Sequence, residues 1–90
     1  MKIIEVEGIV VSNTPYKESS KIINIFTSEY GIIGCISKGC KNLKSKLRLP
    51  SEKFAYGTFH LYYKENGLST LIDGDIKNYF FNIIFFYFFY

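Results

Sequence analysis

Short apolar runs with the periodicity of β-strands follow one another along most of the chain, and each run is ended by residues that favour turns. In the first run, IIEVEGIVV, Ile4, Val6 and Val10 fall on one side and two glutamates fall on the other. Alternation with a period of two is typical of a strand with one buried face. Four further runs are rich in β-branched or aromatic residues, which favour strands. The predicted strands lie at 3–11, 21–27, 32–37, 54–65 and 68–76.

The residues between these runs predict short connections. NTPYKESS at 13–20 predicts a polar connection in which a proline fixes a turn, and SEYG at 28–31 predicts a tight reversal. Asn66 and Gly67 form the strongest hairpin signal, because both residues tolerate a positive φ angle. Ninety residues make one domain at most, and no convincing helix interrupts the runs. The sequence therefore predicts a mostly β fold, a small antiparallel barrel or sandwich of five strands.

The segment KGCKNLKSKLR at 38–48 carries five positive charges and no acid. The whole chain has a net charge of +3, so the other residues sum to −2 and the positive charge is concentrated in this segment. A local positive field attracts polyanions, nucleic acid first and an acidic membrane surface second. A solvated loop that keeps the domain soluble is the alternative explanation. The cations of the segment are Lys38, Lys41, Lys44, Lys46 and Arg48.

No group of residues in the sequence predicts catalysis or metal binding. A nucleophile, a base and an orienting group do not occur together in any motif, so we do not expect an enzyme. Cys35, Cys40 and His60 fall short of the four ligands of a structural zinc site, and no cofactor is predicted. His60 lies among aromatic residues and is expected to pack or to lie at the barrel rim. Asp73 and Asp75 flank a glycine and predict a turn at a strand end.

The start of the chain does not resemble a signal peptide, because two glutamates interrupt its apolar residues. We therefore expect a cytoplasmic protein with reduced thiols. Binding to a membrane surface through an amphipathic helix is not expected, because the basic and aromatic groups lie far apart in the sequence.

The run NYFFNIIFFYFFY at 78–90 holds nine of the seventeen aromatic residues and carries no charge. It is too short for a transmembrane helix, which needs about 20 residues. If exposed, it has the composition of an aggregation-prone segment, so something must cover it: the barrel end, a second copy or a further domain. We therefore expect a domain over 1–77 followed by a helical or apolar tail at 78–90, with self-association through 79–90 as one way of covering it.

Five short pieces of the sequence occur in a characteristic order: EGIV, Y-x-E-x-x-K-I, F-T-x-x-x-G, K-G-x-x-x-x-K-S and P-x-x-x-F. No single piece is specific, but their ordered spacing resembles the N-terminal domain of RecO, a family of bacterial DNA repair proteins. The resemblance extends to about residue 83. The pieces fall at Glu7–Val10, Tyr16–Ile22, Phe26–Gly31, Lys38–Ser45 and Pro50–Phe54.

The resemblance implies an OB-fold over residues 1–77, a five-stranded Greek-key barrel that binds single-stranded nucleic acid. It also implies a recombination mediator that binds single-stranded DNA and anneals complementary strands. Such a mediator helps to load RecA onto strands coated by single-strand binding protein, and RecR acts in the same pathway. Family members continue into a helical domain, often with a cysteine zinc site, so the tail at 78–90 matches the truncated start of that domain.

The cations of 38–48 are the predicted site, because lysines act as point charges that favour phosphates over base edges. The resemblance places Lys17 and Lys21 near the same region, with solvated strand ends as the alternative. Tyr16 is a candidate for base stacking, as are three tyrosines of the fourth run, but packing is the favoured explanation for any single tyrosine. The tyrosines of the fourth run are Tyr56, Tyr62 and Tyr63.

Two other functions fit the same residues. An RNA-binding OB module of the translation machinery would use the same stacking and phosphate contacts, and only contacts to the 2′-hydroxyl distinguish RNA from DNA. A protein-interaction module would instead use the aromatic run at 79–90 as its site.

Overall fold

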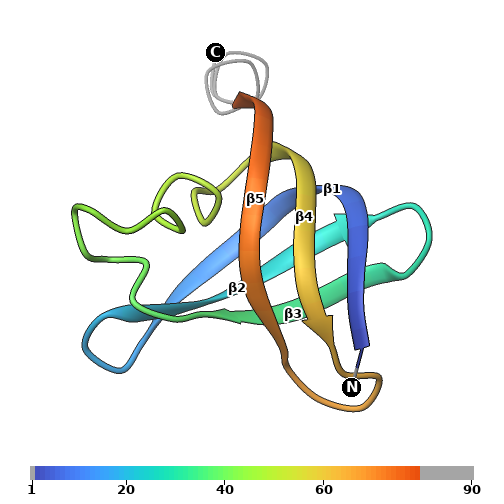
Figure 1. Ribbon diagram of the computed structural model, residues 1–90, viewed down its shortest axis with the longest axis horizontal. Helices are drawn as coiled ribbons and strands as arrows, with labels where there is room; N and C mark the ends of the chain where they lie inside the picture. Colours follow the sequence, from blue (N-terminus) through green and yellow to red (C-terminus); the bar gives the residue numbers. More distant parts are fainter. Residues whose placement is uncertain (1, 80–90) are drawn as a thin grey trace.

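The computed structural model describes residues 2–79 of the chain. This part consists of strands joined by turns and loops, and it contains no helix. Figure 1 shows the strands wrapped around a common interior, with one long connection projecting to the side. The strands are β1 (Lys2–Tyr16), β2 (Ser20–Thr27), β3 (Gly31–Ser37), β4 (Ala55–Tyr63) and β5 (Ser69–Tyr79).

The strands form a closed barrel in the order β1-β2-β3-β5-β4, and β4 pairs back onto β1. Neighbouring strands are antiparallel except β3 and β5, which run parallel through a short contact between 35–36 and 69–70. The parallel contact arises because the long connection after β3 carries the chain across the barrel before the β4–β5 hairpin begins. The predicted mostly β fold is confirmed, closure selects the barrel over the sandwich, and the order is consistent with an OB-fold.

β1 is longer than predicted, because residues 13–16 of the predicted polar connection pair with β2. The first half of β1 pairs with β4 and its second half pairs with β2. A bulge at Val11 interrupts the pairing with β2. Pro15 is tolerated because the second half of β1 pairs with a neighbour on one side only, as an edge strand does. Residues 17–19 alone form the turn.

β5 is also longer than predicted and continues to Tyr79, so the last barrel strand crosses the expected boundary at residue 77. The predicted turn at Asp73 and Asp75 is wrong, because both residues lie inside β5 and pair with residues of β4. The aromatic tail expected at 78–90 lies, from residue 80 onward, outside the described residues.

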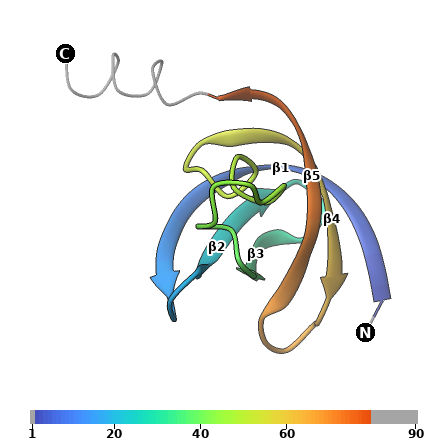
Figure 2. The same ribbon diagram turned by 60° about the vertical axis from the view of Figure 1, so that its left-hand side comes forward.

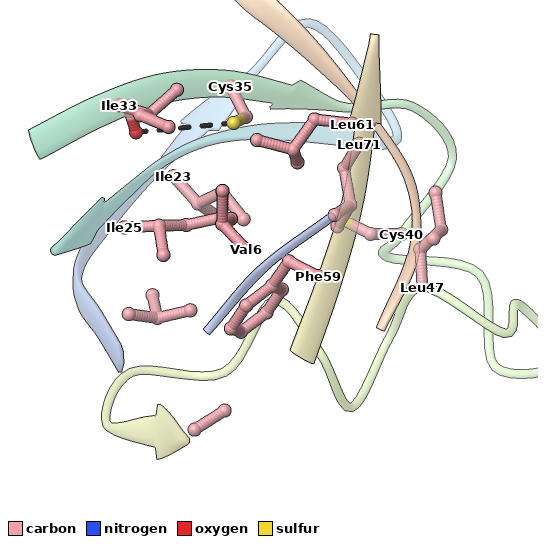
Figure 3. Close-up of a cluster of buried hydrophobic side chains, with 12 residues drawn as sticks. Val6, Ile23, Ile25, Ile33, Cys35, Cys40, Leu47, Phe59, Leu61 and Leu71 are labelled. Atoms are coloured by element: carbon pink, nitrogen blue, oxygen red, sulfur yellow. Dashed lines mark hydrogen bonds between the residues drawn. The ribbon is translucent and has the colours of Figure 1, made fainter. Parts of the chain in front are cut away.

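The barrel interior is filled by the inward-facing residues of all five strands (Figure 3). β2 and β4 alternate between buried and outward-facing residues, with Ile23, Ile25, Phe59 and Leu61 fully buried. Full burial of such a side chain is worth about 1.5–3 kcal/mol. The buried apolar residues are Val6, Val10, Ile23, Ile25, Ile33, Cys35, Cys40, Leu47, Ala55, Phe59, Leu61 and Leu71.

Candidate nucleic-acid interface

The basic segment, residues 38–48, begins directly after β3 and lies in the long connection to β4 (Figure 1). It is a series of tight turns, in which the N–H groups of Asn42, Ser45 and Arg48 each donate to the carbonyl three residues earlier over 3.0–3.2 Å. Cys40 and Leu47 are buried in the core, whereas all five cations of the segment are exposed. The apolar residues therefore anchor the segment on the barrel while its charges stay in water.

Two hydrogen bonds tie the start of the basic segment to the turn between β1 and β2. The N–H of Lys41 donates to the carbonyl of Ser19 over 2.9 Å, and the N–H of Gly39 donates to the hydroxyl of Ser20 over 3.2 Å. These bonds join two parts of the chain that are about twenty residues apart in the sequence. The turn and the basic segment are consequently neighbours on the side of the barrel that comes forward in Figure 2.

Tyr16, Lys17 and Lys21 lie at this same end of β2 and β3. Lys17 occupies the β1–β2 turn with a φ of 55°, and its Nζ lies 5.3 Å from the centre of the Tyr16 ring. Lys21 pairs in register with Ser37, the last residue of β3, so it lies beside the start of the basic segment. The structure thus brings these predicted site residues next to Lys38 and the residues that follow it.

Arg48 lies at the other end of the basic segment, apart from the junction with the β1–β2 turn. It lines a groove in which an exposed leucine, a glutamate, a lysine and an aromatic ring also take part. The other residues that line this groove are Leu49, Glu52, Lys53 and Tyr79. The predicted cations therefore extend along one side of the barrel and do not converge on a single point.

The charges of the barrel are divided between two surfaces. No ion pair formed within residues 2–79 involves a cation of the basic segment. The ion pairs lie instead on the outer surface of β1, β4 and β5, where Lys77 Nζ is 3.8 Å from a carboxylate oxygen of Glu7. We call this surface the acidic face, after its carboxylates Glu5, Glu7, Asp73 and Asp75. A polyanion is attracted to the basic segment and repelled by the acidic face.

His60 lies at the centre of the acidic face, between carboxylates from two other strands. Its Nδ1 is 2.6 Å from Oδ1 of Asp73, and its Nε2 is 2.8 Å from Oε2 of Glu5. The hydrogen bonds to Glu5 and Asp73 raise the pKa of His60 above its ordinary value of 6.5. His60 therefore links three strands from the middle of β4 on the outer surface of the barrel, and it neither packs among aromatic residues nor lies at the barrel rim as expected.

The outer side of β2 and β3 is largely apolar, a feature that was not predicted from the sequence. Phe26 and Ile32 pair directly in register and are 56% and 65% exposed. Ile22 and Ile36 form a second, half-buried pair nearer the basic segment. We call this surface the β2–β3 face. The signal was present in the alternation of the second run, but a strand that is apolar on both sides does not show which side is buried.

The tyrosines of β4 do not lie beside the basic segment. Tyr56 donates its hydroxyl to Oε1 of Glu7 over 2.6 Å on the acidic face, a bond that raises the pKa of Tyr56. Tyr62 is exposed. Tyr63 packs against the core and against the ring of Tyr30, with a centroid distance of 4.9 Å. Tyr63 is therefore half-buried by packing and lies away from the basic segment, and the acidic surroundings make Tyr56 a poor partner for DNA.

Residues 2–79 contain neither a cluster of metal ligands nor a membrane-spanning helix. His, Cys, Asp and Glu side chains are nowhere grouped in threes so that they would hold a metal ion. This part of the chain also has no helix of the length and apolarity needed to span a membrane.

The geometry defines the class of the protein. It is a small closed β-barrel, consistent with an OB-fold, that presents unpaired cations along one side and an apolar strand surface beside them.

Comparison with known proteins identifies the family. Residues 1–80 match the sequence model of the family described as Recombination protein O N terminal. The DNA repair protein RecO of Listeria monocytogenes serotype 4b is 41% identical over 70 residues, which cover 78% of this chain and 27% of that protein. The RecO proteins of Halalkalibacterium halodurans and Bacillus pumilus are 43% and 42% identical over 70 and 74 residues, covering 78% and 82% of this chain and 27% and 28% of theirs.

The chain therefore belongs to the RecO family of DNA repair proteins and corresponds to its N-terminal domain. It spans little more than a quarter of the length of these curated relatives, at 27–28%.

Proposed function

We propose that this domain binds single-stranded DNA without catalysis and serves a RecO-type recombination mediator in the cytoplasm. The observation that carries the proposal is the basic segment, whose five cations are exposed and form no ion pair within the described residues. Displacing condensed counterions from phosphates with such cations is the main source of affinity in sequence-independent binding. Lys17 and Lys21 enlarge the same cationic surface beyond the segment.

The β2–β3 face supplies the second half of the proposed interface. In OB barrels the surface of the second and third strands is where oligonucleotides bind. Here that surface begins beside Lys21 and ends at the exposed pair of Phe26 and Ile32. Bases stack on aromatic rings regardless of sequence, with about 1–3 kcal/mol per base. Phosphates would follow the basic segment and bases would lie against Phe26.

The wider role follows from family membership as a proposal for the whole protein. Neutralising the charge of two complementary strands reduces their repulsion and favours annealing. Loading of RecA, and contacts with RecR and single-strand binding protein, would also require the parts of a RecO protein that extend beyond this chain.

A salt titration of binding to an unstructured oligonucleotide tests the proposal. For single strands, log K changes by about −0.7 per neutralised phosphate for each unit of log salt concentration, so five engaged cations give a slope of roughly −3.5. Lys44→Gln/Lys46→Gln should weaken binding and flatten the slope by about 1.4, whereas Lys44→Arg/Lys46→Arg should keep it. Weaker binding by the Gln variant with an unchanged slope would refute contact between these lysines and phosphate.

Comparison with an RNA oligonucleotide of matched sequence distinguishes DNA binding from the main alternative, an RNA-binding module. The proposal expects DNA to bind at least as tightly as RNA of the same sequence. A clear preference for RNA would support the translation module instead, because only 2′-hydroxyl contacts produce that preference.

A further inference from the structure

A second cationic and aromatic pocket lies at the opposite end of β2 and β3 from the basic segment. It is lined by residues of the β2–β3 turn, the start of β1 and the β4–β5 connection, all of which lie toward the right-hand side of the barrel in Figure 1. Two lysines, one glutamate and a pair of tyrosine rings surround it. The residues that line it are Lys2, Tyr30, Tyr63, Lys64 and Glu65.

The aromatic wall of the pocket is held rigidly. Tyr30 and Tyr63 both pack against the core, and their rings lie 4.9 Å apart with an interplanar angle of 49°. Tyr30 is fixed by its turn, in which its N–H donates to the buried Thr27 hydroxyl over 3.0 Å and that hydroxyl donates to the Gly31 carbonyl over 2.8 Å. Such a surface is ready for a planar group, because binding does not need to order it.

The cationic wall of the pocket is held from the other side. The backbone N–H of Lys64 donates to the hydroxyl of buried Ser69 over 3.0 Å. The side chain of Lys64 runs past Gly67, where an added Cβ would lie 3.3 Å from its Cδ and Cε. Lys2 approaches from β1. Neither lysine forms an ion pair within residues 2–79.

We propose that this pocket is a nucleotide subsite, in which a base lies against Tyr30 and Tyr63 and its phosphate is held by Lys2 and Lys64. This inference rests on the proposed function, because a single DNA strand that runs from the basic segment along the β2–β3 face would reach the turn that carries Tyr30. β2 spans about 23 Å at roughly 3.3 Å per residue. The bound DNA would therefore contact the basic segment and the pocket with nucleotides that lie several positions apart. An aromatic ring pair beside two unpaired cations matches the planar base and anionic phosphate of one nucleotide better than a purely anionic or purely apolar ligand.

The pocket is tested directly by titrating the full 90-residue chain with dTMP and following the tyrosine ring resonances by NMR. We expect dTMP to shift the rings of Tyr30 and Tyr63, and thymidine or inorganic phosphate alone to shift them much less. Lys64→Gln should weaken the dTMP effect, whereas Lys77→Gln removes one equal charge on the acidic face and should leave it unchanged. Equal shifts with phosphate alone, or no shift of either ring, would overturn the subsite.

Oligonucleotide length provides the second arm. Lys64→Gln should weaken binding of an oligonucleotide of about 20 nucleotides by roughly two- to fivefold, the range of an exposed ion pair, and should not affect one of about 6 nucleotides that covers the basic segment alone. Equal affinity of Lys64→Gln and Lys77→Gln for the long oligonucleotide would refute the subsite while leaving the proposed function intact. If the unmodified chain binds neither oligonucleotide, the proposed function fails, and the dTMP titration still tests the pocket by itself.

An acidic peptide is the competing occupant, since lysines also attract carboxylates. A peptide rich in Asp and Glu that shifts Tyr30 and Tyr63 at lower concentration than dTMP would overturn the assignment to a nucleotide.

Discussion

Nδ1 of His60 lies 2.6 Å from Oδ1 of Asp73, and this contact joins β4 to β5 across the acidic face. The other ring nitrogen lies 2.8 Å from Glu5 on β1, so one imidazolium donates to carboxylates on both sides. The bonds to Glu5 and Asp73 raise the pKa of His60 above 6.5 in the folded barrel. The protonated form is therefore favoured by folding, and the barrel is stabilised by it.

The first prediction is a dependence of stability on pH that His60 causes. A group whose pKa is raised by folding contributes stability that is fully present below about pH 6.5 and is lost as the pH rises through the folded-state pKa. The difference in unfolding free energy between the unmodified chain and His60→Gln should therefore shrink as the pH rises above about 6.5. Urea denaturation at several pH values measures it. A difference that grows with pH would contradict the arrangement.

The second prediction concerns the β2–β3 face. Phe26→Ala should weaken binding of single-stranded DNA by about 1–3 kcal/mol if a base stacks on the ring. The free energy of unfolding of Phe26→Ala should stay close to that of the unmodified chain, because the Phe26 side chain is 56% exposed. Ile3→Ala is the matched control, since Ile3 is 62% exposed but lies on β1 beside β4. Fluorescence anisotropy with a labelled oligonucleotide measures both, and equal losses for the two variants would exclude a specific role for Phe26.

The third prediction concerns Gly57, where β4 lies close to the backbone of β5. A Cβ added at Gly57 would lie 2.1 Å from the backbone carbonyl oxygen of Asp75, so Gly57→Ala must push the two strands apart. Overpacking of this kind costs about 1–3 kcal/mol, occasionally more. Thr58→Ala, one residue further on the outer surface, should cost much less. Denaturant midpoints compare the variants, and an unchanged midpoint for Gly57→Ala would show that the strands yield freely.

The fourth prediction concerns the thiols. Cys35 and Cys40 are both buried, and burial raises the pKa of Cys35 to about 12. Burial shields both thiols from reagents, and the thiolate, which is the reactive form, is scarce for Cys35, so neither cysteine should react quickly with a disulfide reagent near pH 8 in the folded chain. Both should react at once in denaturant. Rapid labelling of the folded protein would show that the basic segment opens and exposes Cys40.

The apolar runs predicted that the five strands exist, and the period-two alternation also predicted the buried side of the first strand, where Val6 and Val10 face the interior. Strand ends were less predictable. The polar residues of 13–16 have the composition of a loop, yet they are strand because β2 offers them a partner.

The candidate site was only partly predictable. The charges of 38–48 are local in the sequence and were found directly. The junction between Lys41 and Ser19, the pairing of Lys21 with Ser37 and the exposure of Phe26 depend on tertiary contacts. No local pattern encodes such contacts, so the shape of the interface emerged only from the structure.

The anchoring of the basic segment has a thermodynamic consequence. Cys40 and Leu47 are already buried, and the hydroxyls of Ser37 and Ser51 already lie 2.6 Å apart. The binding surface is therefore already folded before a ligand binds. Association should lack the large negative heat-capacity change that marks folding coupled to binding. Calorimetry over a range of temperatures would then register little beyond ion release and the contact of a few bases.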